Sequence, residues 1–273
     1  MLSEKPWKLM DFLMAMTLLF TLLLVGIFSS LLAALRGDAA MNVQSESVNF
    51  TISLCVYGTM LAVVHMIVRG RETSWRTAFG FTPARLLSAL VTALGVTFIV
   101  LPIARYLGTL SVELMDKVHL KAVPQQSVQM LQTNVSAGSR IFLGILAIVI
   151  APVTEEVLFR GILYPFVKQR GYPKAALLGS AILFGALHLN LMTFVPLTFL
   201  GLILAWLYDT TDNLAAPIFA HSLFNFDNFL QAVLETLKWN WVIIDIATFV
   251  IGGCLVGLVI LFRQRPGAKI NGL

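Results

Sequence analysis

Long apolar runs, separated by short polar and charged segments, recur along the whole chain of 273 residues. A helix needs about 20 apolar residues to cross the hydrocarbon core of a membrane. The runs cover Leu9–Leu35, Val48–Val68, Leu86–Leu107, Ile141–Val167, Ala175–Leu189, Met192–Tyr208, Leu214–Leu230 and Val242–Phe262. The pattern therefore predicts an all-α, polytopic membrane protein with about eight transmembrane helices, folded as a single domain over residues 1–273.

The first run has features of a secretory signal peptide, because Lys5 and Lys8 precede it and Ala33 and Ala34 lie near its end. Its uncharged stretch, Phe12–Leu35, is longer than the apolar region of about 7–15 residues in a signal peptide. We therefore interpret it as a transmembrane helix that is retained.

The composition agrees with a membrane protein. Hydrophobic residues make up 58% of the chain, charged residues 12%, and the mean hydropathy is +0.85. Soluble domains carry roughly 25% charged residues, so a soluble globular domain and a disordered chain are both excluded. The two cysteines, Cys55 and Cys254, lie inside apolar runs, which excludes a secreted disulfide scaffold.

Basic residues in the loops predict the orientation, because they are enriched on the cytoplasmic side. With the N-terminus in the cytoplasm, the cytoplasmic set is Lys5, Lys8, Arg69, Arg71, Arg76, Arg85, Lys168, Arg170, Lys174, Arg263, Arg265 and Lys269, and the outer set is Arg36, Lys117, Lys121, Arg140 and Lys238. We expect both termini to be cytoplasmic, residues 108–140 to form an extracytoplasmic loop, and the protein to reside in a bacterial plasma membrane. Basic residues spread over many loops do not form a nucleic-acid site.

Ionisable residues inside the predicted spans are confined to the C-terminal half of the chain. Such residues cost about 2.5–3.5 kcal/mol each on insertion scales and mark candidate functional sites. They lie in Glu155-Glu156-Val-Leu-Phe-Arg160 of the fourth span, Phe184-Gly-Ala-Leu-His188 of the fifth, and His221-Ser-Leu-Phe-Asn225 of the seventh. At a helical rise of about 1.5 Å per residue, these groups lie ~14–21 Å from the ends of their helices. We predict a polar site between helices four, five and seven.

Helical spacing assigns these side chains to faces. Glu156 and Arg160 are four residues apart, with the acid first, which favours an ion pair. Glu155 is rotated by about 100° from Glu156, so it is free to face a cavity. His221 and Asn225 share one face and could aim at a common target, or serve as hydrogen-bonding groups between helices. A buried carboxylate can act as a general base, and His and Asn donors can stabilise an oxyanion, so the set suits peptide hydrolysis by activated water.

The three motifs, E-E-x-x-x-R, F-x-x-x-H and H-x-x-x-N in this order, resemble the CPBP intramembrane proteases, the CAAX-protease and bacteriocin-processing family. The resemblance covers about residues 141–230, the expected catalytic core. It implies a membrane endopeptidase in which Glu155 and His188 activate water while His221 and Asn225 form an oxyanion hole. Glu156, Arg160 and Phe184 would then be supporting residues. The substrate implied is a membrane-associated or lipid-anchored peptide or protein in the bilayer.

Other functions stay open at this point. Glu155, His188 and His221 are also a plausible zinc set, although the glutamate mechanism requires no cofactor. The same groove could bind a partner without catalysis, as in a bacteriocin immunity protein, and a Glu155/His188 proton relay in a transporter is a third alternative. The motifs G-x-G-D, G-x-S-G and H-E-x-x-H are absent, which argues against other intramembrane protease chemistries. The pattern does not indicate an oligomeric state.

Overall fold

The computed structural model describes residues 4–36, 46–125, 128–129, 131, 136–234 and 241–264, and all secondary structure in these residues is helical. The helices before the polar motifs are α1 (Leu9–Arg36), α2 (Glu46–Gly70), α3 (Trp75–Phe79) and α4 (Pro83–Lys117). One uninterrupted helical rod follows, made of α6 (Ala137–Ile145), η2 (Leu146–Ile150), α7 (Ala151–Glu156), η3 (Val157–Leu163) and α8 (Tyr164–Lys168). The chain continues with α9 (Pro173–Leu187), α10 (Leu191–Thr211), α11 (Ala215–Leu234) and α12 (Trp241–Gln264).

Every predicted apolar run corresponds to one of the eight long helices in the described residues, with the α6–α8 rod counted as one. The prediction was wrong at the end of the third run, because α4 continues ten residues past Leu107 to Lys117. Residues 108–117 are therefore helical rather than part of a loop. Ser111 and Met115 are buried in this extension, so packing continues the helix where the apolar run ends. The short helix α3 was not predicted.

Five segments of the described residues are long and apolar enough to cross a membrane: Thr51–Gly70, Trp75–Lys117, Ala137–Lys168, Leu191–Thr211 and Trp241–Leu261. Leu9–Thr21 of α1 and Pro173–Leu187 (α9) are shorter apolar helices, and α11 carries several polar residues that lower its hydropathy. The protein is thus a polytopic membrane protein, while eight spans stay a prediction. Lys238, Arg265 and Lys269 of the orientation argument lie outside the described residues.

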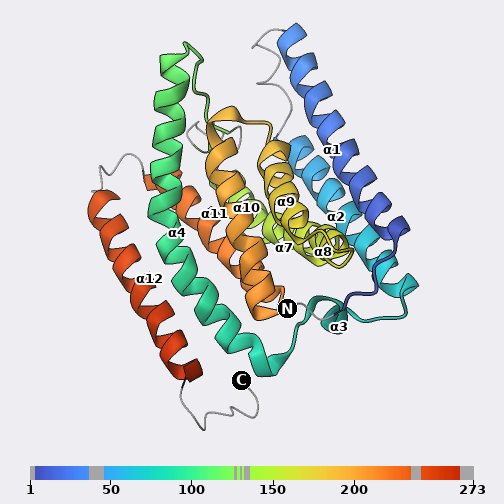
Figure 1. The fold of residues 1–273 in the computed structure, drawn as a ribbon. Coiled ribbons are helices and arrows are strands. Elements are labelled where there is room, and N and C mark those ends of the chain that lie inside the picture. Colours follow the sequence, from blue (N-terminus) through green and yellow to red (C-terminus); the bar gives the residue numbers. More distant parts are fainter. Residues whose placement is uncertain are drawn as a thin grey trace.

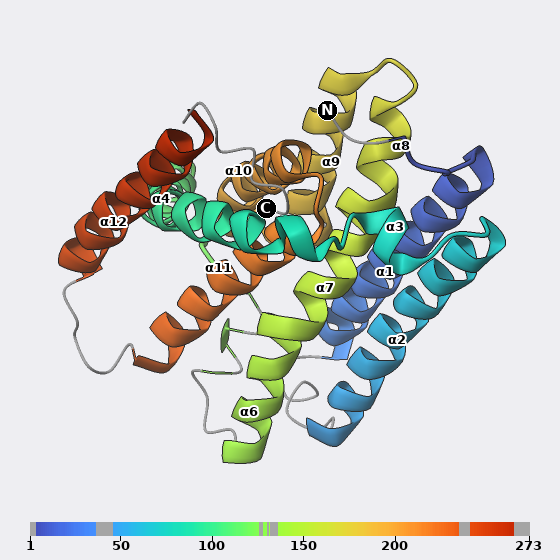
Figure 2. The same ribbon diagram turned by 90° about the horizontal axis from the view of Figure 1, so that it is seen from below.

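The α6–α8 rod occupies the centre of the molecule. Figure 2 shows it between the α1–α2 pair on one side and α11, α4 and α12 on the other. α1 contacts η3, α2 contacts α7, and α11 contacts both η2 and α7. α9 and α10 pack against each other and reach η3 (Figure 1). The rod that carries the first motif is therefore enclosed by helices from both halves of the chain.

The last helix, α12, packs along α4 and is otherwise largely exposed (Figure 1). The two helices approach closely at glycines, since a Cβ on Gly252 would lie 2.6 Å from the carbonyl oxygen of Gly95. Small residues permit such backbone contact between membrane helices. Arg105 of α4 adds ion pairs to Asp245 of α12 and Asp227 of α11, so charge joins these three helices.

Candidate active site

Two π-helical segments flank the turn that carries the paired acids. η2 precedes α7 and η3 follows it, and α7 ends at Glu156. In a π-helix the backbone N–H donates to the carbonyl five residues earlier, and such segments occur frequently at functional sites. Within η2 this pattern is seen at Ala151, whose N–H donates to the carbonyl of Leu146. A π-helix next to proline leaves carbonyl groups without a backbone donor.

Asn225 hydrogen-bonds one of these carbonyl groups. The next residue along after Ala151 is Pro152, which has no N–H to donate to Ala147 five residues earlier. The side-chain amide of Asn225, on α11, donates instead to the Ala147 oxygen at 2.8 Å. The seventh predicted span is thereby joined to the fourth, one helical turn before Pro152.

Trp7 has the same role at the second proline. Pro165 has no N–H for the carbonyl of Gly161, its ordinary α-helical acceptor four residues earlier. The indole Nε1 of Trp7 donates to that oxygen at 2.6 Å, and the Trp7 side chain is buried. Trp7 also packs against Phe79, and a Cβ on Gly161 would lie 2.6 Å from that ring. The segment before α1 thus caps η3.

Glu156 and Arg160 form the predicted ion pair, entirely buried. Nη1 of Arg160 donates to Oε1 of Glu156 at 2.8 Å, and Nη2 donates to the Gly201 carbonyl of α10 at 2.9 Å. Nδ1 of His221 pairs with the same Glu156 oxygen at 2.9 Å. Because a carboxylate accepts, Nδ1 of His221 carries hydrogen and Nε2 points elsewhere. Glu156 therefore orients the His221 ring, and Arg160 neutralises the negative charge of Glu156.

Phe184 lies at the centre of the three motifs and is fully buried. Its ring makes edge contacts with Phe159, His188 and His221 at centroid distances of 5.3, 5.0 and 5.4 Å. The guanidinium carbon of Arg160 lies 4.7 Å from the same centroid. The Phe184 ring therefore packs beside His188 and also contacts Arg160 and His221.

His188 follows the last residue of α9, and its ring orientation is set by the backbone. Nδ1 lies 2.8 Å from the Phe184 carbonyl, which can only accept a hydrogen bond. Nδ1 therefore donates, and the lone pair of the neutral ring is on Nε2. Leu189 then takes a left-handed conformation (φ 49°) and α10 begins after Asn190, which caps it. This turn fixes where the second motif ends.

Glu155, the first of the two adjacent acids, takes no part in the Glu156–Arg160 ion pair. Its Oε2 is buried and has no hydrogen-bond partner among the described residues. Its carboxylate is close enough to His221, Glu156 and Arg160 for electrostatic interaction with each of them. It interacts in the same way with the Tyr57 side chain of α2. No hydrogen bond between Glu155 and His188 is present in the described part of the chain. A buried carboxylate oxygen without a donor is suited to bind water or a substrate group.

The three predicted motifs are thus brought together, since Glu156, Arg160, Phe184, His188 and His221 form one chain of contacts. The observed hydrogen bonds of His221 and Asn225 are those of the second alternative, hydrogen-bonding groups between helices, and a common target for the two side chains stays a prediction. His221 pairs with Glu156, and Asn225 donates to a carbonyl that Pro152 leaves free.

Two residues near the site were missed, Trp7 and Tyr57. Pro165 was a signal for the first, because a proline inside a helix requires a donor from elsewhere. No comparable signal marked Tyr57, which lies on the weakly apolar second run.

The zinc set of Glu155, His188 and His221 was an alternative that the sequence left open. In the described residues, no group of three or more His, Cys, Asp and Glu side chains is arranged to hold a metal ion. Nδ1 of His188 and of His221 is hydrogen-bonded, to Phe184 and to Glu156 respectively.

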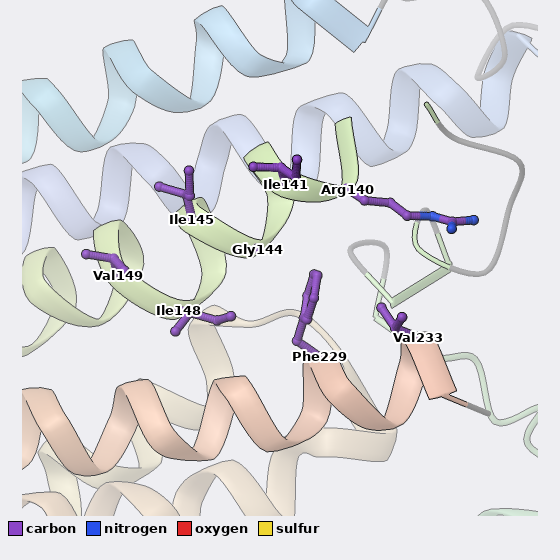
Figure 3. Close-up of a pocket in the computed structure, with 8 residues that line it drawn as sticks. All are labelled: Arg140, Ile141, Gly144, Ile145, Ile148, Val149, Phe229 and Val233. Carbon is purple, nitrogen blue, oxygen red and sulfur yellow. The ribbon is translucent and has the colours of Figure 1, made fainter. Parts of the chain in front are cut away.

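An apolar groove of about 410 Å³ runs beside the site, between the α6–η2 segment and α11. Figure 3 shows Phe229 rising from α11 toward Gly144, with Ile148 and Val149 at one end and Arg140 at the other. Gly144 is required for this contact, because a Cβ there would lie 3.2 Å from the Phe229 ring. Two of its lining residues lie close in the chain to the Asn225–Ala147 hydrogen bond, because Ile148 follows Ala147 and Phe229 lies one helical turn after Asn225.

Comparison with known proteins shows which family part of the chain resembles. The profile described as type II CAAX prenyl endopeptidase Rce1-like matches residues 137–227, which hold all three motifs. Residues 137–227 are an Rce1-like segment. The resemblance predicted from the motifs is therefore confirmed, and the family is one of membrane peptidases.

A relative of the chain is the Bacillus subtilis (strain 168) protein named "Putative membrane peptidase YdiL". It is 32% identical over 81 residues, which are 30% of this chain and 33% of the relative's length. The chain thus aligns with about a third of that protein. No solved structure matches the chain at a significant level.

Proposed function

We propose that this protein is an intramembrane endopeptidase that hydrolyses a peptide bond with water activated by Glu155 and His188. The observation that carries the proposal is the convergence of three helices around Phe184, which leaves one buried carboxylate oxygen, Oε2 of Glu155, without a partner. Glu156 and Arg160 neutralise each other, so the second acid is not needed for charge balance. The Rce1-like segment supports the same conclusion.

In the proposed reaction, Glu155 accepts a proton from water as the water oxygen attacks the carbonyl carbon of the substrate. The developing oxyanion is stabilised by Asn225 and by His221 in its doubly protonated form, in which Nε2–H donates to the oxyanion while Nδ1–H donates to Glu156. Asn225 has two amide hydrogens, and only one of them is used by the Ala147 carbonyl. The proton on Glu155 then passes to the amide nitrogen as the C–N bond breaks. Nε2 of His188 accepts a hydrogen bond from the same water and so holds it in position.

The proposed substrate is a membrane-associated or lipid-anchored peptide or protein. Its lipid or apolar segment would lie in the groove between α6–η2 and α11, which is lined by apolar residues apart from Arg140. Asn225 precedes the lining residue Phe229 by four residues on α11. The family description, a CAAX prenyl endopeptidase, supports this substrate class. The bilayer would present such a substrate directly to the helices.

The test is a comparison of membrane-protein termini in cells that carry the wild type or Glu155→Gln. A matched control is Glu113→Gln, which neutralises an exposed acid on α4 outside the site. New termini present with wild type and Glu113→Gln but absent with Glu155→Gln would identify the substrate. If the termini are the same in all three, and His188→Ala also leaves the cellular phenotype intact, a non-catalytic binding function replaces the proposal.

We further propose that the reaction needs no metal ion. The purified protein should keep its peptidase activity after exhaustive chelation, since no step above uses a metal. Loss of activity on chelation and recovery on addition of zinc would contradict this part alone.

We also propose eight spans with both termini in the cytoplasm. Reporter fusions at the two termini and within residues 108–140 test the orientation. Both termini should report the cytoplasm, and a cytoplasmic signal from the 108–140 fusion would overturn the arrangement.

A further inference from the structure

A second cavity, of about 440 Å³, lies far along the chain from the motifs, between the α3–α4 turn and the α10–α11 turn. Arg76 and Arg85 line it, together with the hydroxyl-bearing residues Thr77 and Thr82. Thr82 precedes α4, and its hydroxyl makes no hydrogen bond to that helix. The cavity is therefore lined mainly by groups that can donate hydrogen bonds.

The charge of the cavity is positive. The guanidinium groups of Arg76 and Arg85 make no hydrogen bond or ion pair with any described residue, so both are available to a ligand; the hydrogen bonds of the two residues are made by their backbones. The acidic group in the lining is Asp212, and Lys5 forms an ion pair with it at 3.4 Å. The Lys5 side chain is nearly inaccessible and also lies over the Tyr208 ring. The one negative charge is thus compensated by a lysine, and two positive charges are in excess.

The shape of the cavity is set by backbone contacts. Gly80 takes a left-handed conformation (φ 72°), and a Cβ there would lie 2.0 Å from the Asp212 carbonyl oxygen. The N–H of Leu214 donates to the Phe79 carbonyl at 3.0 Å. These contacts hold the α3–α4 turn against the α10–α11 turn, so the cavity is preformed.

The position of the cavity relates it to the membrane surface. Trp75–Lys117 is one of the segments able to span a membrane, and the cavity lies at its beginning. Leu86 and Leu87 directly follow Arg85 and are exposed, which is typical of a lipid-facing surface. Arg85 thus stands at the boundary between charged and apolar surface, the level of lipid headgroups.

We propose that this cavity binds the phosphate group of an anionic phospholipid from the surrounding bilayer. Arginine pairs with phosphate through two parallel N–H donors, and two arginines with two threonine hydroxyls can surround its oxygens. The acyl chains would extend along the exposed leucines of α4. A zwitterionic lipid has the same phosphate but adds a cationic group that the excess positive charge disfavours. The site is separate from the proposed peptidase and does not depend on it.

The experiment measures lipid retention by the full chain, purified in detergent and offered phosphatidylglycerol or phosphatidylcholine with identical acyl chains, by native mass spectrometry. Wild type should retain phosphatidylglycerol preferentially. The double variant Arg76→Gln/Arg85→Gln should lose this preference by about 25-fold, since each basic contact near a membrane surface is worth about fivefold. Arg76→Lys/Arg85→Lys should lose less, because the charges remain.

The control is Arg69→Gln/Lys174→Gln, which removes the same charge from two exposed basic residues outside both the cavity and the apolar groove. It should leave the preference unchanged. An equal loss in this control would show attraction by net charge and overturn the proposal.

Inorganic phosphate in excess should displace little lipid; full displacement would assign the cavity to a free anion and contradict the proposal. Equal retention of both lipids by wild type would also contradict it. Glu155→Gln should retain phosphatidylglycerol like wild type, whichever way the peptidase test ends.

Discussion

Replacing Trp7 by Phe tests whether a side chain from the start of the chain compensates for a proline inside the catalytic rod. The change keeps an aromatic ring against Phe79 but removes the indole N–H that donates to the Gly161 carbonyl at 2.6 Å. Pro165 has no N–H to replace it. The buried Gly161 carbonyl would then lose the side-chain donor that the fold supplies.

The magnitude follows from that missing donor. A buried polar group left without a hydrogen bond costs about 1–3 kcal/mol, and Trp7 is 5% exposed. A matched control is Trp75→Phe, which removes the same N–H from an exposed hydrogen bond of 3.1 Å to His65. A surface substitution of this kind changes the unfolding free energy by about 0.5 kcal/mol or less. Trp7→Phe should therefore be the more destabilising by at least ~1 kcal/mol.

A double-mutant cycle with Pro165→Ala separates the hydrogen bond from the packing of the larger ring. Alanine at 165 restores a backbone N–H that can donate to Gly161, so Trp7→Phe should cost ~1–3 kcal/mol less in that background. The assay is equilibrium unfolding in mixed micelles, followed by the loss of helical circular dichroism. A coupling energy below about 0.5 kcal/mol would refute the compensation, because independent sites add within that range.

Three further outcomes are expected. Glu155→Gln should lower peptidase activity by about 10²–10⁴-fold without destabilising the fold, because it removes a buried carboxylate oxygen that has no hydrogen-bond partner among the described residues. Glu156→Gln should instead cost about 3–5 kcal/mol, because it leaves the buried guanidinium of Arg160 unpaired; equal stability of the two variants would contradict the assignment. Gly80→Ala should lower the thermal midpoint far more than Gly171→Ala, because both have positive φ but only the first brings a Cβ to 2.0 Å from backbone. Burial lowers the pKa of Lys5 below its ordinary 10.5, although its partner Asp212 opposes the shift. Between the lowered pKa and 10.5 the unfolded chain therefore binds more protons than the folded chain, and the free energy of unfolding should rise as the pH rises toward 10.5. Lys5→Met should abolish this rise in a pH series of unfolding midpoints.

The helices could be predicted closely because each depends on a local property of the chain. An apolar run long enough to cross a membrane must form its backbone hydrogen bonds internally, and a helix does so without any partner segment. The error at α4 has the same origin: residues 108–117 are less apolar, and burial of Ser111 and Met115 against other helices maintains the helix there. The ion pair of Glu156 and Arg160 was likewise local, since it joins residues four apart.

The sequence by itself determined that the protein lies in a membrane, where its helices are, and which polar residues lie within them. Only the tertiary structure decided which donor reaches which acceptor. Asn225 and Trp7 donate to carbonyl groups 78 and 154 residues away in the chain. The hydrophobic periodicity of the sequence does not predict these donor–acceptor pairs, because they depend on how the helices pack. In an apolar interior a carbonyl deprived of its donor by proline must find another, and where that donor comes from is a property of the folded molecule alone.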